Sequence, residues 1–179
     1  MNPNPIQIAD LSFELLIEKK RIEERIDAMA MEISQVYGDE SLLVIGVLNG
    51  AFMFYSDLVK QLSCPVETAF VKLSSYRGET EQQEISLEWP LTCQLANRHV
   101  LVVDDILDTG RSMDFLLQDW KNLQPKSIRT ACLLNKPTAR IKEVHLDFKG
   151  FDIEDHFVVG YGLDYKEKGR QYSQIYRQK

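Results

Sequence analysis

An acidic, hydroxyl-bearing segment in the middle of the chain carries the residues best suited to chemistry. It reads Val-Val-Asp-Asp-Ile-Leu-Asp-Thr-Gly-Arg-Ser-Met over residues 102–113. Three carboxylates within five residues raise one another's pKa unless hydroxyl groups, a metal ion or a cationic ligand offset their charge. Thr109, Gly110 and Ser112 then place hydroxyls and backbone N–H groups at the expected start of a helix, which favours a phosphate. The segment therefore predicts acceptors for sugar hydroxyls beside donors for a phosphate, as a phosphorylated ribose requires.

The same segment has three competing interpretations. In the first, Asp104 and Asp105 form a solvated turn and Ser112 caps the following helix. In the second, Asp108-Thr109-Gly110 is an aspartic-protease tripeptide, but that chemistry needs two such loops in a β-fold and the chain has one. In the third, the segment belongs to a phosphatase of the haloacid-dehalogenase type, which needs Asp-x-Asp rather than two adjacent aspartates. A sugar-phosphate site remains the favoured interpretation.

The surrounding pattern predicts the elements that position this segment. Short apolar runs indicate buried strands, and longer stretches of good helix formers indicate helices. We expect strands over 42–48, 66–73, 100–103 and 127–134, shorter strands over 144–148 and 157–159, and helices over about 11–37, 51–62 and 113–123. Alternating strands and helices predict an α/β fold with a largely parallel sheet covered on both faces, whose carboxyl edge carries the ligand site.

The remaining stretches are predicted to be irregular. Residues 1–9 contain two prolines in their first five positions and indicate a loose lead-in. Residues 74–84 are polar and contain too few apolar side chains to pack, so we expect an exposed, mobile loop. Residues 85–95 fit a short strand and a turn, without a clear pattern.

Composition and charge restrict the class of protein. The 179 residues are 44% hydrophobic and 27% charged, which indicates one globular domain, or one core domain with a small appendage, and excludes collagen-like and mainly disordered classes. Lys plus Arg is 21 and Asp plus Glu is 27, giving a formal charge of −6, so we expect no nucleic-acid partner. The three cysteines suit neither a zinc site nor a disulfide framework. Because the chain has neither a basic start before an apolar run nor eighteen consecutive apolar residues, we expect a cytoplasmic protein with no membrane partner.

Five motifs along the chain resemble those of a known family. Segment 102–113 resembles the phosphoribosyl-pyrophosphate loop of type I phosphoribosyltransferases, and about 42–170 resembles their hypoxanthine-guanine branch. The other motifs are Gly46-Val47-Leu48-Asn49-Gly50-Ala51, Leu73-Ser74-Ser75-Tyr76, Leu133-Leu134-Asn135-Lys136-Pro137 and Phe157-Val158-Val159-Gly160-Tyr161-Gly162-Leu163-Asp164-Tyr165. The resemblance implies a type I phosphoribosyltransferase fold, with a mainly parallel central sheet flanked by helices, a small hood and a flexible lid loop. It implies a single domain over 1–179, with its core at about 38–140 and its hood from about 1–20 and 141–179.

The resemblance implies that the 5-phosphoribosyl group moves from phosphoribosyl pyrophosphate to N9 of hypoxanthine or guanine. Asp104 and Asp105 would bind the ribose hydroxyls, directly or through Mg²⁺, although the family more often has Glu at the first position. Asp108 would act as general base or acid at N7 of the purine. The backbone amides of 108–112 would hold the 5′-phosphate, together with hydroxyls; this loop comprises Asp108, Thr109, Gly110, Arg111 and Ser112.

The purine site implied by the resemblance uses residues from the second half of the chain. Lys136 would donate to the purine O6 and so select 6-oxo over 6-amino purines. Phe157 would stack on the base, and the Val158 backbone would meet the edge that carries the 2-substituent. Asp164 would border the purine and hold a second Mg²⁺. The preference among hypoxanthine, guanine and xanthine stays open.

The pyrophosphate site and the lid are also implied by the resemblance. Leu48, Asn49 and Gly50 would form the pyrophosphate loop, in which related enzymes often have a cis peptide and many carry Lys where this chain has Asn49. Arg170 would reach the pyrophosphate, and Arg140 is a candidate for the same end. Ser75 and Tyr76 would begin the lid that excludes water.

Two further classes of function remain as alternatives. A xanthine-specific enzyme stays open because the 2-position is read mainly by backbone. An RNA-binding regulator would share the fold and the ligand loop, but it calls for a basic surface that the composition does not favour. The resemblance also implies a homo-oligomer, either a dimer or a tetramer.

Overall fold

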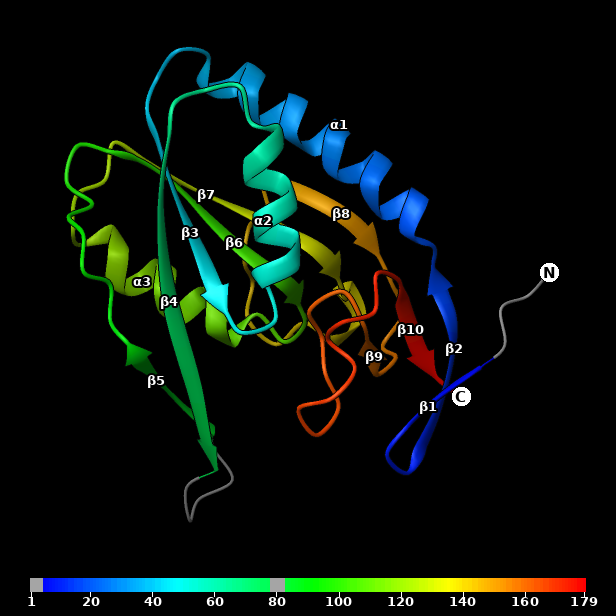
Figure 1. Cartoon of the computed structure of the whole chain (residues 1–179). Helices are drawn as coiled ribbons and strands as arrows, with labels where there is room; N and C mark the ends of the chain where they lie inside the picture. Colours follow the sequence, from blue (N-terminus) through cyan, green and yellow to red (C-terminus); the bar gives the residue numbers. More distant parts are fainter. Residues whose placement is uncertain (1–4, 78–82) are drawn as a thin grey trace.

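The computed structural model describes residues 5–77 and 83–179, and its largest element is a six-stranded sheet (Figure 1). Its order is β5-β4-β3-β6-β7-β8. All neighbouring pairs are parallel except β4 with β5. The strands are β3 (Leu42–Leu48), β4 (Val66–Arg77), β5 (Gln83–Trp89), β6 (His99–Leu107), β7 (Ser127–Asn135) and β8 (Phe148–Asp152). The carboxyl ends of β3, β6 and β7 therefore meet at one edge, as expected for a ligand site in such a sheet.

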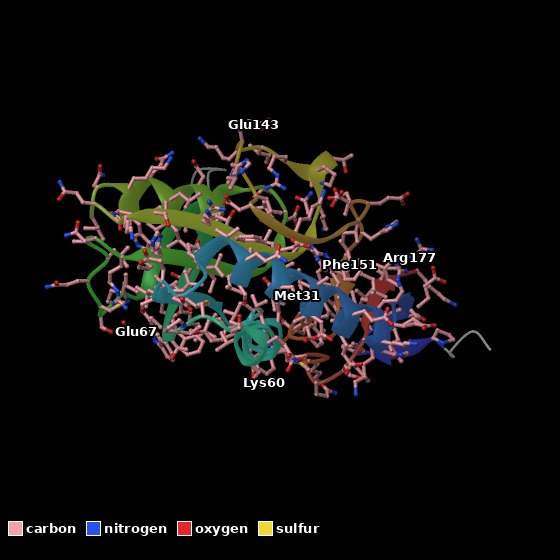
Figure 2. The ribbon with its side chains drawn as sticks, turned by 90° about the horizontal axis from the view of Figure 1, so that it is seen from above. Met31, Lys60, Glu67, Glu143, Phe151 and Arg177 are labelled. Atoms are coloured by element: carbon pink, nitrogen blue, oxygen red, sulfur yellow. The ribbon has the colours of Figure 1, made fainter. Side chains whose placement is uncertain are left out.

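Helices cover both faces of this sheet, because its inner strands are apolar on both sides. Alternate residues of β3 enter different cores. Leu42 and Val44 pack with helices α1 (Lys19–Tyr37) and α2 (Phe52–Gln61), whereas Leu43 and Ile45 pack with α3 (Arg111–Lys121). Figure 2, which views the molecule from above, shows α1 and α2 with Met31 and Lys60 on them. The two cores pack against opposite faces of the sheet and so fix the positions of its strand ends.

A second, antiparallel sheet is built from both ends of the described chain. Its order is β1-β2-β10-β9, from β1 (Ile6–Ile8), β2 (Leu11–Ile17), β9 (Val158–Val159) and β10 (Ile175–Gln178). Ile8, Phe13, Val159 and Tyr176 form its separate small core. The sheet lies beyond the carboxyl ends of β6 and β7 (Figure 1), so chain segments far apart in sequence meet near that edge.

The N-terminal third differs from the sequence prediction. The helix expected over about 11–37 begins only at Lys19, and Leu11–Ile17 is strand β2. The hydrophobic periodicity of residues 11–17 does not distinguish a helix from a strand. Pairing with neighbouring strands decides between them, since Phe13 pairs with Ile6 on one side and Gln178 on the other. The loose lead-in predicted for 1–9 likewise contains β1.

The polar stretch 74–84 was predicted as a loop, but its two ends are paired strands. β4 continues to Arg77 and β5 begins at Gln83, with Ser75 opposite Ile85. Ladder hydrogen bonds stabilise these ends although their side chains are polar. The lid predicted from Ser75 and Tyr76 falls partly on 78–82, which lie outside the described residues. Within residues 85–95, where a short strand and a turn are expected, the strand is the second half of β5, which ends at Trp89.

Two smaller points complete the fold. The strand predicted over 144–148 instead runs from Phe148 to Asp152, because Phe148 pairs with Ala131 of β7. The strand predicted over 157–159 is confirmed as Val158–Val159. The α/β fold with a mainly parallel sheet flanked by helices is confirmed. No helix within 5–77 and 83–179 is long and apolar enough to span a membrane.

Candidate active site

A pocket of about 260 Å³ opens where β6 passes into α3. It is lined by the acidic segment predicted to carry chemistry, together with walls from β3 and β4: Val47, Leu48, Leu73, Asp104, Asp105, Ile106, Leu107, Asp108, Thr109, Gly110, Ser112 and Met113. Gly110 has φ +81°, and a β-carbon there would lie 2.5 Å from the Lys142 carbonyl oxygen. The loop therefore requires glycine at this position.

The chain segment after β7 supports this loop from behind. The Leu107 carbonyl accepts hydrogen bonds from the Lys136 amide at 3.0 Å and from Arg140 Nη2 at 3.2 Å. The Thr109 carbonyl accepts from the amides of Ile141 and Lys142, both at 2.9 Å. Two carbonyl oxygens that would repel a phosphate are thus engaged by the 136–142 segment. This arrangement suits a loop that receives an anion at the N-terminus of α3.

Asp104, which is buried, and Asp105, which is half-buried, form an acidic pair in the pocket wall. Burial raises the pKa of Asp104 well above its ordinary value, and the neighbouring Asp105 charge raises it further. Burial also raises the pKa of Asp105. Each carboxylate accepts a backbone amide: Asp104 Oδ1 from Asp105 N at 3.0 Å, and Asp105 Oδ1 from Ile106 N at 2.9 Å. An acidic pair of this kind favours a ligand that brings hydroxyl donors or positive charge.

The acidic pair also has the donor atoms that Mg²⁺ prefers, namely carboxylate oxygens. Within 5–77 and 83–179, no group of three or more His, Cys, Asp or Glu side chains could hold a metal by itself. Mg²⁺ commonly keeps waters and takes substrate oxygens as ligands. Asp104 and Asp105 therefore fit an ion that arrives with a phosphorylated substrate.

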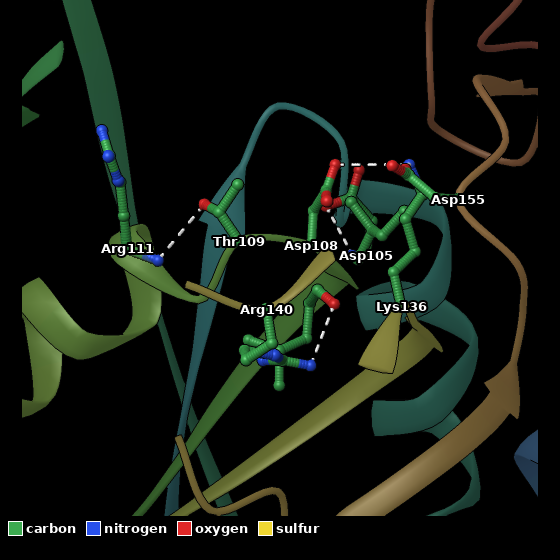
Figure 3. A network of polar contacts seen from close by, with 9 residues as sticks. Asp105, Asp108, Thr109, Arg111, Lys136, Arg140 and Asp155 are labelled. Atoms are coloured by element: carbon green, nitrogen blue, oxygen red, sulfur yellow. Dashed lines mark hydrogen bonds and ion pairs between the residues drawn. The ribbon is translucent and has the colours of Figure 1, made fainter. Parts of the chain in front are cut away.

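Lys136 lies between two carboxylates at the end of β7 (Figure 3). Its Nζ is 3.3 Å from Asp108 Oδ2 and 3.1 Å from Asp155 Oδ1. Only 7% of the lysine side chain is exposed. The structure thus brings Lys136 and Asp108 together, although 28 residues separate them in the chain. A buried cation next to an acidic group can recognise a carbonyl and move a proton on one ligand.

Two arginines of the predicted site, Arg140 and Arg111, are not among the residues that line the pocket. Arg140 hydrogen-bonds the Leu107 carbonyl and Asn135 Oδ1, below the loop in Figure 3. Asn135 in turn donates from Nδ2 to Asp152 Oδ1 at 2.5 Å. The side chain of Arg111 points away from Asp108 and Lys136 (Figure 3). In this arrangement Arg140 contacts the loop from below, and the Arg111 amide donates to Thr109 Oγ1 at 3.5 Å (Figure 3).

The predicted pyrophosphate loop packs against the acidic pair and the C-terminal segment. The Leu48–Asn49 peptide is cis. A β-carbon at Gly50 would lie 1.7 Å from Asp105 Oδ2, and one at Gly162 would lie 2.0 Å from the Gly50 carbonyl oxygen. These close approaches bring three chain segments to one edge of the pocket.

Arg170 and Asp164 border the same edge. Arg170 Nη1 donates to the Gly162 carbonyl at 2.7 Å, and its Nη2 is 2.7 Å from Asp164 Oδ1. The Arg170 charge also acts to lower the pKa of Asp105, against the larger effect of burial. Asp164 Oδ2 accepts the Glu167 amide at 2.8 Å. The predicted pyrophosphate arginine therefore lies within electrostatic reach of the acidic pair.

The predicted aromatic platform, Phe157, directly precedes β9 of the second sheet. The Phe157 ring packs edge-on against Tyr165, with ring centroids 5.7 Å apart, and against Phe13 at 6.3 Å. Phe157 is partly exposed, whereas Val158 is buried in β9. The side chains of Ser75 and Tyr76 lie outside the described residues, so their predicted role in a lid is carried by sequence alone.

Sequence reasoning missed two polar residues that the fold brings to this site and a third that lines a separate pocket. Asp155 contacts Lys136, Asn135 holds Arg140, and Asp57 of α2 accepts a hydrogen bond from Tyr161 Oη at 2.5 Å. A usable signal existed for Asp155, which lies two residues before Phe157 in an acidic turn and could have been paired with the predicted buried lysine. Asn135 and Asp57 carried no such signal, because their partners are set by tertiary packing.

The fold and the site together define an α/β protein with an acidic, hydroxyl-bearing pocket at the carboxyl edge of its sheet. A family model described as "Phosphoribosyl transferase domain" matches residues 15–166. The hypoxanthine phosphoribosyltransferase of Haemophilus influenzae is 37% identical over 167 residues, covering 90% of this chain and 93% of that protein. The hypoxanthine-guanine phosphoribosyltransferase of Bacillus subtilis is 35% identical over 158 residues, covering 88% of each.

Solved structures agree with these matches. A crystal structure of a hypoxanthine-guanine phosphoribosyltransferase from Bacillus anthracis aligns with a TM-score of 0.88 at 32% identity, covering 92% of this chain and 97% of that one. The chain belongs to the phosphoribosyltransferase family. Its similarity to the hypoxanthine-guanine branch, inferred from five motifs, is confirmed by these relatives.

Proposed function

We propose that the protein is a purine-salvage enzyme that forms IMP or GMP. It transfers the 5-phosphoribosyl group of phosphoribosyl pyrophosphate to N9 of hypoxanthine or guanine and releases pyrophosphate. The observation that carries this proposal is the contact of buried Lys136 with Asp108 at the end of the sugar-phosphate loop. That contact places a carbonyl-recognising cation and an acid–base group next to the site for the sugar.

The loop residues bind and orient the phosphoribosyl group. Asp104 and Asp105 accept hydrogen bonds from the ribose hydroxyls. The backbone amides of 108–112 and the hydroxyls of Thr109 and Ser112 hold the 5′-phosphate at the start of α3. These contacts fix C1′ of the sugar for attack by N9.

Metal binding is proposed at the same acidic pair. Asp104 and Asp105 would hold Mg²⁺ with oxygen atoms of phosphoribosyl pyrophosphate, and Asp164 would contribute a second position at the far edge. Bound Mg²⁺ supplies positive charge that neutralises the leaving pyrophosphate. Asp164 is paired with Arg170 in this structure, so a metal ion at Asp164 would take the place of the guanidinium.

Transfer breaks the bond between C1′ and the pyrophosphate oxygen and forms the bond between C1′ and N9. The bonding electrons leave with pyrophosphate, and the purine gives up one proton. Asp108 accepts that proton at N7. Backbone at Leu48, Asn49 and Gly50, with the Arg170 guanidinium, stabilises the departing pyrophosphate. We assign Arg140 to support of the loop, since its guanidinium is bound to the Leu107 carbonyl.

Base selection follows from the charge of Lys136. The ammonium donates to the purine O6, whereas a 6-amino group presents hydrogens and leaves the buried cation unsatisfied. Phe157 stacks on the base, and the Val158 backbone meets the 2-position. The second sheet acts as the hood and, with a lid beginning at Ser75 and Tyr76, excludes water from the oxocarbenium-like transition state. The proposed division is a core at about 38–140 with a hood from about 1–20 and 141–179; assembly into a dimer or tetramer stays a prediction.

The test is a transfer assay with the purified protein, phosphoribosyl pyrophosphate and Mg²⁺, followed by absorbance with hypoxanthine, guanine, xanthine and adenine in turn. We expect turnover with hypoxanthine and guanine and at least a roughly hundredfold lower efficiency with adenine. Xanthine turnover alone would move the assignment to the xanthine-specific alternative. No product from any purine, together with tight RNA binding, would replace the enzyme by the regulator.

A further inference from the structure

The Lys136 ammonium has two carboxylate partners, and they come from different parts of the fold. Asp108 follows β6, whereas Asp155 lies in the segment that joins β8 to β9. The distances are similar, 3.3 Å to Asp108 and 3.1 Å to Asp155 (Figure 3). Removing the counter-charge of a buried ammonium is strongly destabilising, so this pairing is a substantial part of how the lysine is held.

In the proposed reaction, the contact between Lys136 and Asp108 competes with the contacts that both groups make to the base. The lysine must donate to O6 while the aspartate acts at N7 of the same base. If Asp108 were the sole counter-charge, binding of the purine would leave the ammonium without one, or would leave Asp108 engaged and unable to take a proton. A second carboxylate that stays with the lysine removes this conflict.

The fold holds Asp155 next to Lys136 independently of the groups that react. The Ile153 amide donates to the Asn135 carbonyl at 2.9 Å, which ties the 153–155 segment to the residue before Lys136. The Asp155 side chain is 65% exposed. Its Oδ2 can therefore stay hydrated while Oδ1 pairs with the Lys136 ammonium. The carboxylate is therefore held by the lysine and the solvent, without help from the reacting groups.

We propose that Asp155 is a positioning residue for 6-oxopurine recognition: it remains the counter-ion of Lys136 and thereby releases Asp108 to the base. The inference rests on the proposed function and extends it to a residue outside the five motifs. Without Asp155, the ammonium moves toward Asp108, donates less well to O6 and hinders proton transfer. Loss of Asp155 therefore weakens recognition of the 6-oxo group specifically.

The neighbouring Glu154 provides a matched control. It carries the same charge in the same segment, but its Oε2 lies 2.9 Å from His156 Nε2. Glu154→Gln therefore removes one charge next to Asp155 while leaving the Lys136 pair intact. Asp155→Glu keeps the charge and tests whether a carboxylate is what the position needs.

The experiment measures IMP and AMP affinity by calorimetry for the wild type, Asp155→Asn, Asp155→Glu and Glu154→Gln, with kinetics in parallel. We expect Asp155→Asn to weaken IMP binding about tenfold, equivalent to about 1.4 kcal/mol. AMP binding and the KM for phosphoribosyl pyrophosphate should change less than twofold. Asp155→Glu should restore most of the loss, and Glu154→Gln should match the wild type. Melting temperatures establish that each variant is folded.

A double-mutant cycle with Lys136→Met shows whether Asp155 acts through the lysine. In the Lys136→Met background, Asp155→Asn should have no further effect on IMP affinity. The inference is overturned if Asp155→Asn behaves like Glu154→Gln, if it weakens IMP and AMP equally, or if the two losses add. Absence of transfer by a wild type that binds IMP would instead overturn the proposed function, and failure to bind either nucleotide would overturn both.

Discussion

Gly50 lies so close to Asp105 that a β-carbon at position 50 would stand 1.7 Å from the Asp105 carboxylate oxygen Oδ2. The predicted pyrophosphate loop and the acidic pair are therefore in direct contact, with no room for a side chain between them. Gly50→Ala must displace one of the two. We expect the KM for phosphoribosyl pyrophosphate to rise at least tenfold in this variant, with a smaller change in the KM for guanine.

A glycine outside the site controls for general damage. Gly38 ends α1 with φ +55°, and a β-carbon there meets nothing within 4 Å. Gly38→Ala should lower the free energy of unfolding by about 1 kcal/mol without changing either KM. Equal effects of the two substitutions on the KM for phosphoribosyl pyrophosphate would argue against a specific role for the contact between Gly50 and Asp105.

The ligand-free protein should become more stable when the charge of the buried Asp104 carboxyl is removed. Burial, and then the Asp105 charge, raise the pKa of Asp104 above its ordinary value of 3.8. The folded state thus binds this proton more tightly than the unfolded state. Its contribution to stability is complete below about pH 3.8 and is lost as the pH rises through the folded pKa. At neutral pH, Asp104→Asn should raise the melting temperature of the ligand-free protein by about 2–4 °C, equivalent to about 1 kcal/mol.

The same substitution should reverse its effect when substrate is present. An asparagine side chain lacks the charge that binds Mg²⁺, so the stabilisation that phosphoribosyl pyrophosphate and Mg²⁺ give the wild type should be largely lost in Asp104→Asn. Melting curves from about pH 5 to about pH 8, with and without ligand, measure both effects. A ligand-free variant that melts below the wild type at neutral pH would show that the acidic pair is stabilising as it stands.

Arg140 should act through the phosphate loop. Its Nη2 donates to the Leu107 carbonyl at 3.2 Å, and its contact with Asn135 fixes the guanidinium below the loop. Arg140→Lys keeps the charge but replaces the fixed, planar Nη2 group that donates to both partners by a rotatable ammonium. We expect about tenfold weaker GMP binding and less than threefold weaker pyrophosphate binding, measured by calorimetry. A larger loss of pyrophosphate binding than of GMP binding would instead assign Arg140 to the pyrophosphate site, as the resemblance implies.

Asp108 is the residue on which turnover should depend most. Asp108→Asn keeps the shape of the side chain but cannot accept a proton from the purine. We expect kcat to fall by a factor of about 10²–10⁴, while affinity for phosphoribosyl pyrophosphate stays within about threefold of the wild type. Rapid turnover by this variant, measured by absorbance with hypoxanthine, would move the proton-transfer role to another group.

The chemistry could be located from the sequence because the relevant residues are local. Asp104, Asp105, Asp108 and the hydroxyls of Thr109 and Ser112 lie within nine residues, so their types and order already predict a sugar-phosphate loop at the end of a strand. The inner strands were also predictable, since burial on both faces demands unbroken apolar runs. These features depend on few long-range contacts.

The remaining features depend on tertiary packing. Leu11–Ile17 has a composition that suits a helix, and its pairing with β10 makes it a strand. The contact of Asp155 with Lys136 spans 19 residues, and that of Tyr161 with Asp57 spans 104. The acidic turn before Phe157 gave a signal for Asp155, but no local pattern encodes the contact between Tyr161 and Asp57, because it requires the tertiary fold to be in place first. Of the misassigned elements, 1–9 and Leu11–Ile17 belong to the second sheet, whereas the ends of β4 and β5 and the shifted strand β8 lie at the two edges of the six-stranded sheet.

The most direct test is a crystal structure of the protein with bound IMP. We expect the 5′-phosphate against the backbone amides of 108–112, the ribose hydroxyls at Asp104 and Asp105, and O6 of the base within hydrogen-bond distance of Lys136 Nζ. An empty pocket at this loop with the nucleotide bound elsewhere, or a base turned so that O6 faces away from Lys136, would contradict the proposed function.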